Sequence, residues 1–201
     1  MFNSKKYWND RYKKGQTSGS GSYNKLAQFK ADVINNFIEK TQIKSIIDYG
    51  VGDGNQLKLI TTENLTYTGI DVSEIIISKC EREFKDDNTK RFIHADNIVD
   101  DLRAELVLSC DVIYHLIEEH VYKKYMENLF TFSKKYVIIY AKNQDINHAV
   151  HVRFRRFSNY IKSNLPAWQL IEHIPNTYPQ LKLGQDNDKT SPSDFYIYKK
   201  V

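Results

Sequence analysis

Apolar positions follow two spacings along the chain, one typical of helices and one typical of strands. Between residues 24 and 40, apolar side chains recur every three or four positions, which predicts a helix with one apolar face. Further helices are expected from Asn55, from an N-cap at Ser73 to about Phe84, over 119–132 and over Arg156–Leu165. Short β-branched runs predict strands at Lys44–Tyr49, Leu65–Val72, Arg91–Ala95, Glu105–Ser109, Lys135–Ala141, Trp168–Ile174 and Asp194–Lys199.

The order of these elements indicates the fold class. Strands alternate with helices through residue 141, which implies an α/β protein with a parallel sheet. Lys135–Ala141 is apolar throughout, as expected of a strand covered on both faces. The last predicted strand, Asp194–Lys199, alternates apolar and polar residues, as an edge or antiparallel strand would.

Length, composition and charge limit the kind of protein this is, but they do not identify a binding partner. The 201 residues suit one domain, and with no repeat or linker visible we expect residues 1–201 to form it. The net charge of +4 permits an anionic partner but does not require one. No apolar window approaches a membrane span and no signal peptide is visible, so a cytoplasmic protein is expected. Cys80 and Cys110 fit no metal-ligand spacing, and no metal is expected.

The strongest local motif is a glycine-rich turn after the first predicted strand. Asp48 is followed by Gly50, Gly52 and Gly54, which allow a tight turn and a close approach of the backbone to a ligand. A dinucleotide fingerprint requires its third glycine at position 55, where this chain has Asn55. The carboxylate of Asp48 suits a cationic ligand better than a pyrophosphate.

A second acidic motif follows the next predicted strand. Asp71, followed by Val72, stands at the strand end, where a carboxylate can accept hydrogen bonds from both hydroxyls of a ribose. Nicotinamide-dependent enzymes share this feature, so it supports an adenosine ligand without choosing between cofactors. Asp96 and Asn97 follow the third predicted strand and add a further polar pair at the same edge of the sheet.

In this order, the motifs resemble those of the class I S-adenosylmethionine (SAM)-dependent methyltransferases. The resemblance implies a Rossmann-like three-layer αβα sandwich with a seven-stranded, mostly parallel sheet whose last strand is antiparallel. It places Asp48 near the amino group of SAM and Asp96 on the adenine amino group. The cofactor contacts expected from it are Tyr12, Asp48, Gly50, Gly52, Gly54, Asn55, Asp71, Val72, Asp96, Asn97 and Cys110.

Residues 109–116 resemble the fourth motif of the same family, which points Asp111, Tyr114 and His115 toward the methyl group. His115 is a candidate general base, because its unperturbed pKa lies near working pH. The alternative is a histidine that packs on the cofactor.

Two further segments are candidates for contact with the acceptor. In an extended chain His151, Arg153 and Arg155 would share one face, which could hold a carboxylate or phosphate. A charged surface loop is the alternative. The opening stretch resembles a helix that caps the SAM site, and the Gly/Ser-rich residues 16–22 make residues 1–23 a candidate lid. Tyr7, Trp8, Arg11 and Tyr23 are the acceptor contacts expected there, and the resemblance also brings Arg11 and Tyr12 toward the carboxylate of SAM.

A narrower resemblance concerns the acceptor. The 18–26, 111–115 and 151–153 segments are similar to short bacterial methyltransferases encoded among capsule and surface-glycan genes. The acceptor implied is a small sugar-related or phosphorylated capsule precursor, methylated on oxygen, with no nucleic acid or membrane partner. RNA or protein methylation, a non-catalytic SAM-binding protein and a nicotinamide-dependent oxidoreductase remain alternatives.

Overall fold

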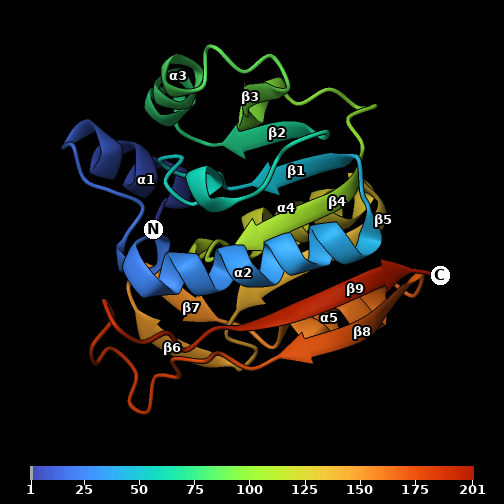
Figure 1. Cartoon of the computed structure of the whole chain (residues 1–201). Coiled ribbons are helices and arrows are strands. Elements are labelled where there is room, and N and C mark those ends of the chain that lie inside the picture. Colours follow the sequence, from blue (N-terminus) through green and yellow to red (C-terminus); the bar gives the residue numbers. More distant parts are fainter. Residues whose placement is uncertain (1) are drawn as a thin grey trace.

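A computed structural model describes residues 2–201, and a seven-stranded sheet forms its centre (Figure 1). The strand order is β3-β2-β1-β4-β5-β9-β8. The first five strands are parallel, and β9 is antiparallel to both of its neighbours, which confirms the predicted sheet. The strands are β1 (Ser45–Tyr49), β2 (Thr66–Asp71), β3 (Lys90–His94), β4 (Ala104–Cys110), β5 (Ser133–Ala141), β8 (Trp168–Ile174) and β9 (Asp194–Lys200).

Helices cover both faces of this sheet. On one face lie α2 (Asn24–Thr41) and α3 (Glu74–Glu83), and on the other α4 (Glu119–Thr131) and α5 (Phe157–Asn164). The strands serve both layers by alternation, since Leu106 and Leu108 pack toward α2 whereas Val107 between them packs toward α4. A further helix, α1 (Ser4–Lys13), lies at the carboxyl ends of the parallel strands (Figure 1).

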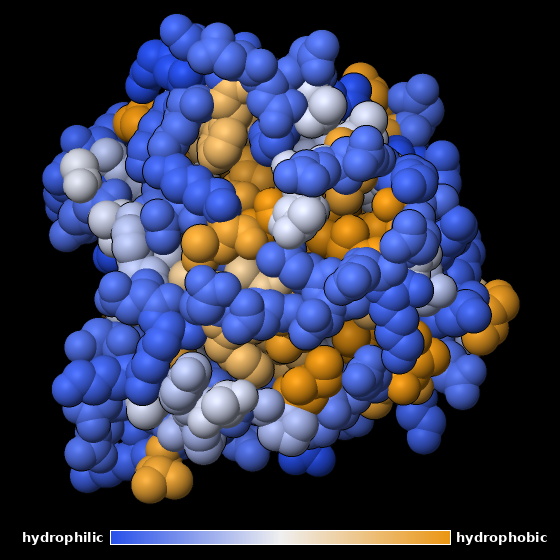
Figure 2. All heavy atoms as spheres, in the orientation of Figure 1, coloured by the Kyte–Doolittle hydropathy of each residue, from blue (hydrophilic) through white to orange (hydrophobic). Residues whose placement is uncertain are grey.

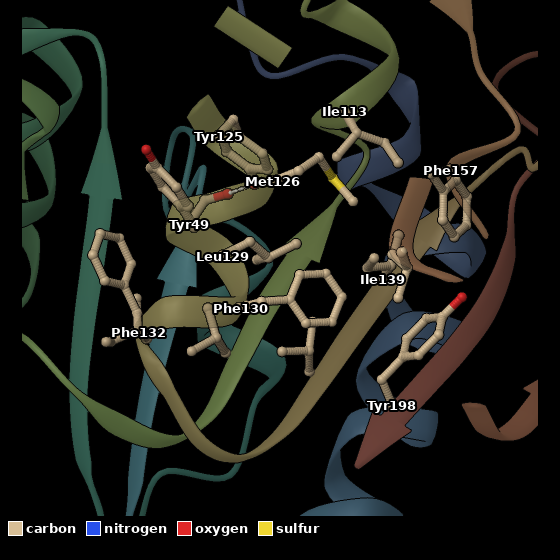
Figure 3. Packing of buried hydrophobic residues seen from close by; sticks show 14 of the residues in the cluster. Tyr49, Ile113, Tyr125, Met126, Leu129, Phe130, Phe132, Ile139, Phe157 and Tyr198 are labelled. Carbon is tan, nitrogen blue, oxygen red and sulfur yellow. Dashed lines mark hydrogen bonds between the residues drawn. The ribbon is translucent and has the colours of Figure 1, made fainter. Parts of the chain in front are cut away.

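The core beneath α4 fixes that helix close to the same ends of the strands. Met126 and Leu129 are fully buried against the sheet, where Ile139, Phe157 and Tyr198 meet them (Figure 3). The hydroxyl of Tyr125 donates to the carbonyl of Tyr49 and lies 2.9 Å from Ser109 Oγ, whose own O–H can donate to it, so this core phenol stays hydrogen-bonded.

Two segments differ from the predicted elements. The helix expected from Asn55 is wrong, because the chain there forms turns and one short 3₁₀ helix, η2 (Leu57–Leu59). Gly54 has a φ of +78°, and the Asn55 side chain donates to the carbonyl of Ser22, so neither residue starts a regular helix. After β5 the chain forms a hairpin of β6 (Ile146–Ala149) and β7 (Val152–Phe154), two strands absent from the predicted elements.

The surface of the protein is mostly hydrophilic in the view of Figure 2. α2 presents a hydrophilic outer face, and apolar residues reach the surface in bands on either side of it (Figure 2). No helix in the described part of the chain has the length and apolar character needed to cross a bilayer.

Candidate active site

A cavity of about 630 Å³ lies at the carboxyl ends of the parallel strands. This is where α/β folds of this kind bind their ligands. Its wall combines segments from the whole chain: α1, the glycine-rich turn, the end of β2, the loop after β4, and the first turns of α4. Of the residues predicted from sequence, the cavity wall contains Trp8, Tyr12, Asp48, Gly50, Gly52, Asp71, Val72, Cys110, Asp111 and His115.

The glycines of the turn are required by neighbouring protein atoms. Gly50 and Gly52 have φ values of +111° and +58°. A Cβ at Gly50 would overlap Val112 Cγ2, and one at Gly52 would overlap Ser18 Oγ. These two glycines are therefore required by the packing of the chain itself, and their contact with a ligand stays a prediction. Their backbone still forms cavity wall, whereas Gly54 packs beside Cys80 and lies outside it.

The amide groups of the turn are already hydrogen-bonded. The N–H groups of Gly50 and Val51 donate to the carbonyl of Ile70 at 2.8 and 3.0 Å. The N–H of Gly52 donates to Asp71 Oδ2 at 3.1 Å. The turn is thus held on the end of β2 and presents carboxylates rather than free amides to the cavity, which disfavours a pyrophosphate ligand.

Two buried carboxylates set the electrostatics of this wall. Burial raises the pKa of Asp71 to about 6, although the N–H groups of Ser73 and Gly52 favour its ionised form. Burial likewise raises the pKa of Asp48 to about 6, and Asp48 Oδ2 accepts a hydrogen bond of 2.7 Å from the Tyr67 hydroxyl. Each carboxylate of the pair keeps lone pairs for a ligand, and a cationic ligand would favour the ionised form of both.

A buried ion pair closes the cavity behind the end of β4. Asp111 adopts a φ of +61°, and its Oδ2 lies 2.7 Å from Lys30 Nζ. Its Oδ1 accepts a hydrogen bond of 2.8 Å from the Tyr114 hydroxyl, so Tyr114 supports Asp111 and does not itself line the cavity.

The sequence prediction missed Lys30, whose side chain is only 1% exposed. A signal was present in the sequence. Lys30 lies four residues after Leu26 and four before Ile34, on the buried stripe of α2, where a lysine needs a partner.

His115 is held in one tautomer by its neighbours. Its Nδ1 lies 2.9 Å from the carbonyl oxygen of His151, and a carbonyl can only accept, so Nδ1 carries the proton. Nε2 therefore keeps its lone pair. Burial lowers the pKa of His115 to about 4, which keeps the imidazole neutral at physiological pH. The ring of Trp8 contacts that of His115 edge-on, with centroids 4.9 Å apart.

The predicted anion-binding face is divided by the structure. Arg155 donates to the carbonyls of Leu116 and Ile117 at 2.7 and 2.9 Å and lies over the ring of Tyr122. The proposed role of Arg155 in anion binding is therefore corrected, since Nη1 and Nη2 bond to backbone carbonyls and the side chain is only 9% exposed. Arg153 is 42% exposed and lies 3.4 Å from Glu119. His151 stacks on Tyr7 with ring centroids 5.0 Å apart, and its carbonyl oxygen lies 2.9 Å from His115 in the cavity wall.

The Gly/Ser-rich segment is docked on the glycine-rich turn. The N–H of Ser18 donates to Asp53 Oδ2 at 2.9 Å, and the N–H of Asp53 donates to Ser18 Oγ at 2.8 Å. Tyr23 donates to the same Asp53 carboxylate at 2.7 Å, which accounts for this tyrosine without acceptor contact. Asn55 binds the Ser22 carbonyl and also lies outside the cavity wall. Asp53 is thus a residue that the sequence prediction missed, and it holds the segment closed.

Asp96 and Asn97, the residues expected at the adenine, lie outside the cavity wall. Asp96 and Asn97 lie on the 3₁₀ turn η3 (Ala95–Asn97) and are exposed. The Asp96 carboxylate pairs with Lys5, and of these two residues only Lys5 belongs to the cavity wall. Direct contact of Asp96 and Asn97 with an adenine therefore stays a prediction. Within residues 2–201 no three His, Cys, Asp or Glu side chains gather as metal ligands.

The sheet order and the cavity at its carboxyl edge define a Rossmann-like methyltransferase fold. The sequence model of a family described as "Methyltransferase domain" matches residues 23–189. The match covers most of the chain, so the chain belongs to this family and is a SAM-dependent methyltransferase.

Solved structures agree on the fold. The N-methyltransferase NodS from Bradyrhizobium japonicum WM9, in complex with S-adenosyl-L-homocysteine, is similar with a TM-score of 0.77 and 12% identity over 99% of both chains. Magnesium protoporphyrin IX methyltransferase from Synechocystis PCC 6803 gives 0.69 and 13% over 98% of both. The CcbJ methyltransferase from Streptomyces caelestis gives 0.68 and 10% over 100% of both. At these identities the likeness shows the fold alone. No curated protein matches the sequence.

The residues present fit SAM as the cofactor. Asp71 has the free lone pairs that ribose hydroxyls require, and Asp48 offers a carboxylate to the ammonium group. The wall carries no free row of amides for a pyrophosphate. The cavity volume also falls within the usual range for small-molecule sites, roughly 300–1,000 Å³.

Proposed function

We propose that this methyltransferase methylates a hydroxyl or phosphate-type oxygen of a small polar acceptor, sugar-related or phosphorylated. The observation that carries the proposal is the neutral His115 in the cavity wall, whose Nε2 keeps a free lone pair. A hydroxyl must lose its proton as its oxygen attacks, and an imidazole with a fixed tautomer is suited to accept that proton.

Bound SAM supplies a methyl group on a positively charged sulfur. The residues of the chain provide alignment and a proton acceptor. Asp71 and Asp48 hold the two ends of the cofactor, while Trp8 and Tyr12 cover the cavity and exclude water. His115 Nε2 would accept the hydroxyl proton as the new carbon–oxygen bond forms and the methyl–sulfur bond breaks, which leaves S-adenosylhomocysteine. The imidazolium would then release the proton to solvent. Because the pKa of His115 is lowered to about 4, the base stays available across physiological pH.

The charges around the mouth favour an anionic acceptor. Lys5 and Lys124 belong to the cavity wall. The Arg11 guanidinium lies 5.7 Å from the centre of the Trp8 ring. Arg153 lies 3.4 Å from Glu119, at the start of α4. Together with Tyr7, Trp8 and His151, these side chains form the surface that we assign to the acceptor. The resemblance to capsule and surface-glycan methyltransferases is the support for a glycan precursor in particular.

The test is methyl transfer from SAM to a panel of sugar phosphates and nucleotide sugars, with products detected by mass spectrometry. For the accepted compound, we expect His115→Asn to lower kcat by about 10²–10⁴-fold while the Kd for S-adenosylhomocysteine changes less than threefold. His120→Asn is the matched control, because this exposed histidine also reaches the cavity wall.

Three outcomes would contradict the proposal. Unchanged turnover in His115→Asn would remove the base from the mechanism, and loss of turnover in His120→Asn alone would assign it elsewhere. Methyl incorporation only into RNA or protein would exclude a small acceptor.

A further inference from the structure

The methyl-transfer proposal leaves one cavity-wall group unused, the ammonium of Lys30. This side chain rises from the buried stripe of α2 and is 1% exposed. Its Nζ lies 2.7 Å from Asp111 Oδ2 and 5.4 Å from the centre of the Tyr140 ring. Asp48 is close enough to contribute to its electrostatic environment. Lys30 therefore pairs with the carboxylate that follows β4 and lines the same cavity wall as Asp48 of β1.

Lys30 has more hydrogen-bond donors than the chain uses. An ammonium has three N–H groups, and a buried one requires acceptors for them. Among the described residues, Asp111 is the hydrogen-bond acceptor found for Lys30 Nζ. The Tyr140 ring offers a weak cation–π contact to the same ammonium. At least one donor is thus free for a ligand in the cavity that Lys30 helps to line.

The local charges match one end of the cofactor. Asp48 and Asp111 provide two negative charges and Lys30 one positive charge. The amino-acid end of SAM carries the inverse set: an ammonium, a sulfonium and one carboxylate. Asp48 alone complements the cationic groups but leaves the ligand carboxylate without a partner. Lys30 is the buried cation of the described wall that lies beside Asp48.

We infer that Lys30 binds the carboxylate of the methionine part of SAM and shares its ammonium between that carboxylate and Asp111. This inference rests on the cofactor occupying the cavity described above. It makes Lys30 a cofactor-binding residue, and it means that the Lys30–Asp111 ion pair contributes to cofactor binding as well as to the stability of the fold. Asp111, held by Tyr114 on its other oxygen, then positions the ammonium.

The test measures which part of the ligand the protein recognises. Calorimetry would compare S-adenosylhomocysteine with its decarboxylated analogue, S-adenosyl-3-thiopropylamine, which lacks only the carboxylate. We expect the wild-type protein to prefer the first by about 10–100-fold, the usual range for a charged hydrogen bond. Lys30→Met should reduce this preference to less than threefold by weakening S-adenosylhomocysteine alone. Lys25→Met, an exposed position on the same helix, should keep the preference.

A structural role for Lys30 would give different results. If Lys30→Met weakened both ligands equally, or kept the wild-type preference, the inference would be overturned. Should Lys30→Met fail to fold because it strands the Asp111 charge, Lys30→Met with Asp111→Asn removes both charges, and the same comparison applies. If the wild-type protein bound neither ligand, the cofactor site itself would be refuted, which is a separate failure from a lost preference.

Discussion

The two sides of the cavity are built by different means. Much of the cofactor side comes from neighbouring parallel strands, where Asp48 lies one residue before the end of β1, Asp71 ends β2, and the turn after β1 bonds to β2. The acceptor side comes from segments far apart in the sequence, such as Ser4, whose hydroxyl donates to the carbonyl of His115 at 2.8 Å. Local motifs thus place the carboxylates and the turn of the cofactor side, whereas Lys30 and the acceptor side depend on segments that lie far apart in the sequence.

The docking contacts on the acceptor side are polar and specific. The N–H of Ser4 donates to Glu118 Oε1 at 2.8 Å, which ties α1 to the loop before α4. The carbonyl of His151 then fixes the tautomer of His115. A substitution on the acceptor side should therefore change the position or tautomer of His115 by removing a residue that holds it. A substitution on the cofactor side should act directly on the glycine-rich turn.

The largest effect should follow Gly50→Ala, which tests whether the turn is fixed by its own backbone and its protein neighbours. The new Cβ would overlap Val112, and a φ of +111° is strained for alanine. We expect the free energy of unfolding to fall by about 3–4 kcal/mol, the sum of overpacking and backbone strain.

Gly15→Ala is the matched control for this substitution. Gly15 has a φ of +70°, but no atom lies within 4 Å of the point that an alanine Cβ would occupy, so only backbone strain of about 1 kcal/mol should appear. Urea unfolding of both variants measures the difference. Equal losses would show that Val112 yields to the new methyl group and that the turn is less constrained than described.

The same division explains what could be predicted from the sequence. The sheet, the glycine-rich turn and the carboxylates at the strand ends could be read from local patterns, because β-branched runs and the Asp48–Gly54 spacing report their own backbone geometry. Lys30, Asp53 and the β6–β7 hairpin could not, since their roles depend on partners that lie more than ten residues away or on short strands with weak signals. Arg155 was misassigned because spacing shows a shared face but not the carbonyls that occupy it.

Replacing the two arginines of the acceptor side should have an intermediate effect on the free energy of unfolding, and the effect should differ between them. Arg155→Met leaves the carbonyls of Leu116 and Ile117 without their donor, and we expect a loss of about 2–3 kcal/mol of unfolding free energy. Arg153→Met should leave stability within about 0.5 kcal/mol, since this side chain is exposed, and should raise the acceptor KM several-fold. Thermal unfolding and steady-state kinetics measure both. An unaltered KM in Arg153→Met would remove this arginine from acceptor binding.

The smallest effect on the free energy of unfolding should follow replacement of Asp48, whose buried carboxylate is suited to a cationic ligand but destabilises the protein when no ligand is bound. Burial raises its pKa from 3.8 to about 6, so the ionised form destabilises the empty protein, and stability is lost as pH rises between these values. Asp48→Asn should therefore raise the free energy of unfolding by about 2 kcal/mol at pH 7.5 and change it little at pH 4. Binding of S-adenosylhomocysteine should weaken at least tenfold at pH 7.5, with exposed Asp86→Asn as control. Retained affinity together with lost stability would instead make Asp48 a structural acceptor for Tyr67.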